Sequence, residues 1–313
     1  MTSIMTNSSA MAAIATLRSI NSSMETTQDR ISSGYRVGSA ADNSAYWSIA
    51  TTMRSDNKAL STVQDALGLG AAKTDVAYTA MESSIDVVDE IKAKLVAASE
   101  PGVDKSKIQK EIKELQNQLV SIAKSASFSG ENWVYNDPNN TAGTKSIVGS
   151  FNRDADGNVS LTTLQFDTTK SSLIEVDASG DYVTNGDGVL SNFMEYEDAT
   201  GSTVTMTYSL LEMDISSMTA GDLSEALSGV DAALQTMTDA ASDLGALNSR
   251  VDMQKDFVAD LMDSIEKGVG KLVDADMNEE STRLKALQTQ QQLGIQSLSI
   301  ANSNSQNILS LFR

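Results

Sequence analysis

Cysteine and histidine are both missing from this chain of 313 residues. Without cysteine the protein can form neither a disulfide framework nor a thiolate nucleophile. Without histidine it cannot build a histidine-based catalytic triad or a zinc-protease motif. Carboxylates are plentiful, but no motif singles out a pair for general acid–base catalysis, and no glycine-rich phosphate loop is present. We therefore expect no enzymatic activity and no cofactor.

Proline and long apolar runs are scarce as well. Pro101 and Pro138 are the two prolines, and the pair Pro101-Gly102 predicts the end of a helix. No apolar run reaches the length of about 18 residues that a membrane-spanning helix needs. The first residues, Met1 to Ile4, lack the basic start and apolar core of a cleavable signal peptide. Taken alone, these two observations predict a cytoplasmic protein.

The net charge of −19 is unevenly distributed. Residues 137–222 hold fourteen acidic residues against Lys145, Arg153 and Lys170, whereas residues 281–313 contain no acidic residue at all. This pattern predicts a middle segment that faces solvent and ends that pack against other protein. Nucleic acid is not an expected partner, because phosphate binding requires a basic surface.

An apolar seam recurs every three and four residues in the segments 60–98, 108–126 and 223–275. A spacing of about 3.5 residues keeps these side chains on one line and indicates a partner helix along the whole length. Charged residues make up 21% of the chain, yet none occupies a seam position. An ordinary amphipathic helix would be shorter, with a wider apolar face. The predicted rod core comprises Leu60, Val63, Leu67, Met81, Val88, Ile91, Leu95, Ile112, Leu115, Leu119, Leu244, Leu247, Val251, Val258, Leu261, Ile265 and Leu272.

Apolar residues also recur outside the rod, in segments 4–31 and 284–312. The heptad phase slips at 274–280, which predicts a joint between two helical regions. The last segment carries two overlapping apolar stripes, so that one internal partner would cover only half of it. We expect these segments to make contacts between subunits. The predicted assembly residues are Ile14, Leu17, Met24, Ile31, Leu284, Leu287, Leu293, Leu298, Ile300, Ile308, Leu311 and Phe312.

The middle of the chain, 139–211, differs in character from both ends. Turn signals and alternating stretches such as 159–161 and 204–208 predict short strands. The acidic turn 154–158 does not fit a calcium-binding loop, because its glycine and its twelfth residue, Gln165, are wrong for one. We expect a plain turn there and no metal site. Trp47 and Trp133 are expected to be packing residues.

These patterns predict a mainly α fold, a long antiparallel coiled-coil rod built from both chain ends with a small β-containing central insert. We expect three domains. Residues 1–43 with 277–313 would form a terminal helical domain for polymerisation. Residues 44–138 with 212–276 would form the rod, and 139–211 would form the exposed variable domain.

Segment 29–43, DRISSGYRVGSAADN, followed by Ile49-Ala50, resembles the signature of bacterial flagellin. The residues of this signature loop are Arg30, Gly34, Arg36, Asp42 and Asn43. The end of the chain, with Asp274-Ala275-Asp276 and 301–311, and the turn Phe128-Ser129-Gly130 are similar to other parts of the same family. The resemblance covers about residues 1–135 and 215–313. The sequence of residues 46–55 is similar to that of flagellins of soil α-proteobacteria.

The resemblance implies a subunit that self-polymerises into the extracellular flagellar filament for swimming motility. It overturns the cytoplasmic expectation, because flagellins leave the cell unfolded through the flagellum's own channel without a cleaved signal. The implied partners are copies of the chain itself, other flagellins, an export chaperone at the C-terminal helix, the filament cap and hook-junction proteins. A hook–filament junction protein, a secreted enzyme with a catalytic insert and a secreted adhesin are the alternatives.

The resemblance also implies contact with host immune receptors, which in this family read the segment matching 29–50 and a patch near 90–94. Here Ala41, Asn43 and Tyr46 depart from the family pattern in the first segment, as do Glu90 and Lys94 in the second. We therefore expect weak recognition by both kinds of receptor.

Overall fold

The computed structural model describes residues 7–154, 156–197 and 202–310, with the backbone alone for 304–310. These residues form five α-helices: α1 (Ser8–Ser33), α2 (Ser44–Ala98), α3 (Lys105–Ser125), α4 (Ala220–Val273) and α5 (Met277–Ser310). The chain divides into two compact units, one of 1–58 with 262–313 and the other of 59–261. The expected stop at Pro101-Gly102 is confirmed, because α2 ends at Ala98, and α1 ends at Ser33, just before Gly34.

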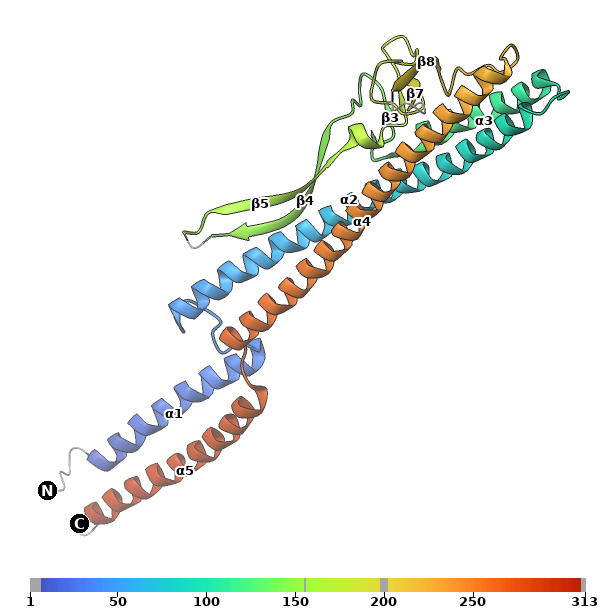
Figure 1. The fold of residues 1–313 in the computed structure, drawn as a ribbon. Helices are drawn as coiled ribbons and strands as arrows, with labels where there is room; N and C mark the ends of the chain where they lie inside the picture. Colours follow the sequence, from blue (N-terminus) through green and yellow to red (C-terminus); the bar gives the residue numbers. More distant parts are fainter. Residues whose placement is uncertain (1–6, 155, 198–201, 311–313) are drawn as a thin grey trace. The chain divides into compact units, whose positions relative to one another are not determined.

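The unit of residues 59–261 is built on α2 and α4, which run side by side in opposite directions (Figure 1). Thr74 on α2 donates a hydrogen bond to Asn248 on α4 at 3.1 Å, and Lys92 pairs with Asp231 farther along. α3 folds back along α2, where Lys94 pairs with Glu111. The fold class predicted from the seams is confirmed.

The seam positions supply the core of this unit. Every seam position of α2 from Leu60 to Ala98 is buried, and so is every seam position of α4 from Leu223 to Val251. Side chains as large as Leu67, Met81 and Ile91 have no exposed surface. Burying one such side chain is worth roughly 1.5–3 kcal/mol, so the two helices stabilise each other along their shared length.

The predicted core register is wrong in α3. Leu115 is only half-buried, and Gln116 is buried in its place, together with Ile112, Leu119 and Ala123. The reason is the segment 209–215, whose backbone carbonyls face the helix. Gln116 Nε2 donates to Leu210 O at 2.8 Å and to Met213 O at 3.0 Å, which satisfies groups that a leucine would leave unpaired.

The register also moves near the end of α4. The predicted core residues Leu261, Ile265 and Leu272 are half-buried, whereas Val269 and Val273 are buried. A straight α-helix has 3.6 residues per turn and drifts away from a seam of period 3.5, so the buried face rotates along a helix of this length.

The insert consists of small two-stranded sheets. β4 (Thr144–Arg153) and β5 (Val159–Asp167) form a long hairpin with a bulge between Val148 and Ser150, and β7 (Phe193–Glu197) pairs with β8 (Thr203–Ser209). The expected strands at 159–161 and 204–208 lie in β5 and β8. β1 (Ser127–Phe128) pairs with β2 (Glu131–Asn132), and β3 (Tyr135–Asn136) with β6 (Ile174–Glu175). The β3–β6 pair therefore ties the insert to residues before 138.

The insert packs on the rod at Gly70 of α2 (Figure 1). A Cβ at this position would lie 2.3 Å from Ile147 Cγ2 of β4, so only glycine admits the strand this close. Trp133 is buried and stacks on Phe166 of β5 with ring centroids 5.8 Å apart, as expected of a packing residue.

Candidate functional site

α1 and α5 form an antiparallel pair within the unit of residues 1–58 and 262–313 (Figure 1). Asn7 Nδ2 donates to Ala301 O at 3.0 Å at one end, and Gln291 Nε2 donates to Asn21 Oδ1 at 2.8 Å in the middle. At Gly294 a Cβ would lie 2.8 Å from Leu17 Cδ2, so this glycine lets the two helices approach closely. The pair brings together residues that are far apart in the sequence.

The pair divides the predicted assembly residues into two groups. One group is half-buried and turns toward the partner helix: Leu17, Met24, Ile31, Leu284, Leu287 and Leu298. These positions are therefore at least partly covered within one subunit, whereas the sequence suggested that they await another copy. Ile308 lies among the residues whose side chains are not described, and Leu311 and Phe312 lie outside the described residues.

The second group points away from the pair. Ile14 is 39% exposed, Leu293 58% and Ile300 62%. Met11 and Ile295 share this exposure, and the sequence reasoning missed both because they fall off its heptad phases. We call these five residues the outer face of the terminal pair, meaning the apolar side chains of α1 and α5 that the pair leaves exposed. Met11 and Ile14 share one side of α1, and Leu293 and Ile300, seven residues apart, share one side of α5, whereas Ile295 lies on another side of α5.

Residues 34–43, the part of the signature loop that follows α1, connect α1 to α2 and bind the end of α4. Gly34 ends α1 with a φ of 77°, a left-handed conformation that glycine adopts without strain. The amides of Arg36 and Val37 donate to Val273 O at 2.7 and 3.1 Å, and Ala275 N donates back to Gly34 O at 2.9 Å. The loop and the break between α4 and α5 thus hold each other in place, where the sequence predicts a joint.

Arg36 supplies a charge to the same helix end. Its Nη2 donates to Leu272 O at 3.0 Å, one of the carbonyls that the last turn of α4 leaves without a helical partner. A cation at a helix C-terminus also interacts favourably with the helix dipole. Val37 packs with Ala50, Val269 and Val273 in a small apolar cluster below the loop.

Asp42 and Asn43 close the loop and start α2. The Asp42 carboxylate accepts from Ser39 N at 2.9 Å, Gly38 N at 3.1 Å and Ser39 Oγ at 3.0 Å. These hydrogen bonds, the one from the Ser39 amide first, lower the pKa of Asp42. Asn43 Oδ1 accepts from Tyr46 N at 3.1 Å and so caps the first turn of α2.

Arg30 joins the loop to α5. Its Nη1 lies 3.1 Å from Oε1 of Glu280, whose side chain is 6% exposed, and Arg283 reaches the same oxygen at 3.3 Å. Two guanidinium groups on one nearly buried carboxylate fix the start of α5 against the end of α1. All five signature-loop residues therefore have structural partners at this joint.

Trp47, expected to be a packing residue, is only partly covered within one subunit. Its side chain is 38% exposed, and Tyr46 and Ile49 beside it are 42% and 49% exposed. Ala50, three residues along the same helix, is buried in the apolar cluster with Val37, Val269 and Val273.

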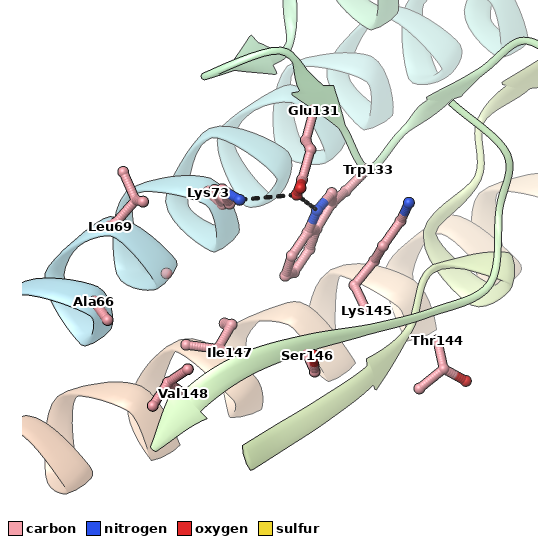
Figure 2. Close-up of a pocket in the computed structure, with 11 residues that line it drawn as sticks. Ala66, Leu69, Lys73, Glu131, Trp133, Thr144, Lys145, Ser146, Ile147 and Val148 are labelled. Atoms are coloured by element: carbon pink, nitrogen blue, oxygen red, sulfur yellow. Dashed lines mark hydrogen bonds and ion pairs between the residues drawn. The ribbon is translucent and has the colours of Figure 1, made fainter. Parts of the chain in front are cut away.

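One pocket among the residues that the structure describes holds a small cluster of polar groups. A pocket of about 360 Å³ lies between α2 and β4, and Figure 2 shows Glu131 at its rim. Glu131 pairs with Lys73 at 2.9 Å and accepts from Trp133 Nε1 at 3.5 Å, and the hydrogen bond from Lys73 lowers the pKa of this carboxyl. These polar groups bind each other and hold the segment that follows α3 against α2.

The acidic turn 154–158 also uses its polar groups within the subunit. In the acidic turn, the Asp154 carboxylate accepts hydrogen bonds from the amides of Asp156 and Asn158 and from Asn158 Nδ2, so its oxygens are occupied by the turn. No cluster of three or more potential metal ligands occurs among the residues that the structure describes. In the same residues, we find no helix with the length and apolar character needed to cross a membrane.

Comparison with known proteins gives consistent matches at both chain ends. The model of the bacterial flagellin N-terminal helical region matches residues 4–138, and that of the C-terminal helical region matches 227–312. Flagellin C of Rhizobium meliloti (strain 1021) is 62% identical over 327 aligned positions, and the alignment covers both chains completely. Flagellin of Brucella melitensis biotype 1 is 44% identical, again with both chains covered completely.

Among solved structures, the crystal structure of Bacillus cereus flagellin aligns with 63% of this chain and 88% of its own. The sequence identity is 18% and the TM-score is 0.38, so the family assignment rests on the sequence matches.

Proposed function

The chain belongs to the bacterial flagellin family, and from this premise we propose that the outer face of its terminal helix pair is the surface through which copies polymerise. The protein is a structural subunit of the extracellular flagellar filament and not an enzyme. The relatives that match it over its whole length are flagellins, and no finding favours a hook–filament junction protein.

One observation carries the proposal. Met11, Leu293, Ile295 and Ile300 are each more than half exposed although they sit on a helix pair that already buries its other face. Water contact of this much apolar surface is unfavourable, and burial against another copy would recover roughly 25 cal/mol for each Å² covered. Exposed apolar patches of this kind mark interaction surfaces.

The experiment compares two double variants with matched exposure. Leu293→Ser with Ile300→Ser removes apolar groups from the outer face, where they are 58% and 62% exposed. Val159→Ser with Leu161→Ser removes groups that are 58% and 60% exposed from the β4–β5 hairpin. We expect the first variant to raise the critical concentration for polymerisation about a hundredfold or more, and the second to leave it nearly unchanged.

Deletion of 284–313 should abolish polymerisation and leave the rod soluble and helical. Sedimentation and electron microscopy measure filament formation, and circular dichroism checks that each variant keeps its helices. Equal polymerisation of the outer-face variant and the unmodified chain would refute the proposal.

We further propose the domain roles that the sequence suggests: polymerisation for 1–43 with 277–313, support for the rod of 44–138 with 212–276, and solvent exposure for 139–211. The break between α4 and α5, next to the signature loop, supports the first division. The β3–β6 pair favours moving the next boundary toward the end of α3, because it joins residues 135–136 to the insert.

The remaining partners are proposals that rest on the family. We propose that an export chaperone binds the C-terminal helix, that cap and hook-junction proteins contact the assembled chain, and that export occurs without cleavage of a signal. The intact mass of filament protein tests the last point. Weak recognition by host receptors is proposed for 29–50 and 90–94, and reporter-cell responses to the filament protein and to the 29–50 peptide test it.

A further inference from the structure

Several large apolar side chains outside the terminal pair are exposed, and two of these sites carry a tryptophan or a phenylalanine that has no role in the contacts described so far. Trp47 on α2 is 38% exposed. Met253 and Phe257, one turn apart on α4, are 63% and 56% exposed. Aromatic side chains such as tryptophan and phenylalanine dominate the energetics of protein–protein interfaces, so these two sites are candidates for an interaction surface.

Trp47 shares its side of α2 with one basic residue, Arg54. Trp47, Thr51 and Arg54 follow each other at spacings of four and three residues, so they lie on one side of α2, and all three are exposed. Thr51 Oγ1 donates to Trp47 O at 2.7 Å, and the Arg54 guanidinium lies 5.0 Å from the centre of the Tyr35 ring, which orients it. We call Trp47, Thr51 and Arg54 the Trp47 face.

The surroundings of Phe257 are acidic. Met253, Asp256, Phe257 and Asp260 lie on one side of α4, and all four are exposed. Arg250 borders this side one turn earlier and leaves it with a net negative charge. We call Met253, Asp256, Phe257 and Asp260 the Phe257 face. Among the described residues no ion pair involves Asp256 or Asp260.

We propose that the Trp47 face of one copy docks on the Phe257 face of a second copy. This inference rests on the proposed function, because an open helical filament requires a heterologous contact, in which two different surfaces of the chain meet. The two faces match in chemistry: each has an aromatic anchor, and Arg54 meets Asp256 and Asp260. Pairing of either face with itself would bring like charges together, which opposes a symmetric dimer.

The absence of cysteine makes a direct test available. Chains carrying Trp47→Cys and chains carrying Phe257→Cys, distinguishable by mass, are mixed, polymerised and treated with a short bifunctional maleimide. Each chain holds a single thiol, so every cross-link joins two copies. We expect the mixed dimer to dominate over either homodimer in the filament and to be absent from dilute monomer.

A matched control replaces Trp47→Cys by Val96→Cys, which lies on the same helix and is 55% exposed. Filaments that form normally but give no more mixed dimer than this control would overturn the inference while leaving the proposed function intact. Failure of the unmodified chain to polymerise would instead refute the proposed function. If either cysteine variant fails to polymerise, Thr51→Cys and Asp260→Cys report on the same two faces.

A charge exchange provides a second readout. Arg54→Glu should raise the critical concentration at least tenfold, and adding Asp256→Arg and Asp260→Arg in the same chain should restore it to within a few-fold. Persistence of the full defect in the triple variant would also contradict the contact.

Discussion

Single polar side chains stabilise the turns and segment contacts of this protein by hydrogen bonding to backbone N–H and C=O groups that have no helical partner. Arg36 donates to the last carbonyls of α4, Asn43 caps α2, and Gln116 donates to the carbonyls of Leu210 and Met213. None of these side chains belongs to an apolar seam. Their contribution lies in satisfying buried or terminal backbone groups, which would otherwise destabilise the fold.

Gln116 gives the first prediction at this scale. Gln116→Leu fills similar space but leaves the carbonyls of Leu210 and Met213 without their donor, so we expect the free energy of unfolding to fall by about 1–3 kcal/mol. Urea unfolding of the monomer, followed by circular dichroism, measures this change. Gln118→Leu, at an exposed position on the same helix, is the control. An equal effect of both substitutions would contradict the role of Gln116.

Asp42 makes the signature loop sensitive to acid. Its pKa is lowered, mainly by the hydrogen bond from the Ser39 amide, so the folded loop favours the ionised carboxylate. The stabilisation is complete above the ordinary carboxyl pKa of about 4 and is lost as the pH falls through the lowered pKa. In the filament, where we expect residues 1–40 to be ordered, the solid-state NMR signals of the Gly38 and Ser39 amides should titrate in that range.

The matched variant is Asp42→Asn, in which this titration of the Gly38 and Ser39 signals should disappear. Asp29→Asn, on α1 and outside these hydrogen bonds, should retain it. Persistence of the titration in the Asp42 variant would show that another group controls the loop.

At the scale of the element, helix ends and buried faces follow different rules. The helix ends are determined by residues next to them in the sequence: Asn7 and Asn43 cap α1 and α2, and Gly34 ends α1. Which face of a helix is buried depends also on the segments packed against it and on the helix period. In α3, the face rotates to bury Gln116 because 209–215 lies against it. In α4, the 3.6-residue turn moves the buried face to Val269 and Val273, which pack with Val37 and Ala50.

The contact between α2 and the β4–β5 hairpin yields a prediction at this scale. Gly70→Ala places a methyl group where Ile147 now lies, so we expect lower protection of the β4 amides from hydrogen exchange. Gly68→Ala, two residues away in the same helix with open space around it, should instead stabilise the helix by roughly 0.5–1 kcal/mol.

Adding Ile147→Ala to Gly70→Ala should restore part of the lost protection, since the methyl group then has space. Undisturbed β4 protection in Gly70→Ala alone would mean that the hairpin does not depend on this close approach.

At the scale of the molecule, the rod and the terminal pair differ in how much of their apolar surface a single copy covers. Rod helices bury large side chains completely, whereas the α1–α5 pair covers one face of each helix and leaves the outer face in water. An isolated pair of helices with half-buried contacts is expected to be weakly stable. Assembly would supply the missing contacts.

We therefore predict that residues 1–40 and 280–313 are ordered mainly in the polymer. Hydrogen exchange should be fast in these segments of the dilute monomer and slow in the filament, by coupled folding and binding. The rod segment 60–98 should be protected in both states and serves as the internal reference. Strong protection of both termini in dilute monomer would contradict the prediction.

Much of the architecture could be predicted because it depends on local patterns. The seam spacing predicted the rod, Pro101-Gly102 predicted the end of α2, and the phase slip at 274–280 predicted the break between α4 and α5. Short strands such as β5 and β8 were found from alternation and turn residues. Each of these features is determined by residues that are neighbours in the chain.

The sequence by itself determined where this protein is helical, where its helices end and which long seams are apolar. Only the tertiary structure decided that Gln116 replaces Leu115 in the core, that Trp47 is exposed, and that Leu17 and Leu298 turn toward a helix of the same subunit while Leu293 and Ile300 do not. The physical reason is that periodicity specifies a face of a helix, whereas the neighbours that cover the face come from distant parts of the chain.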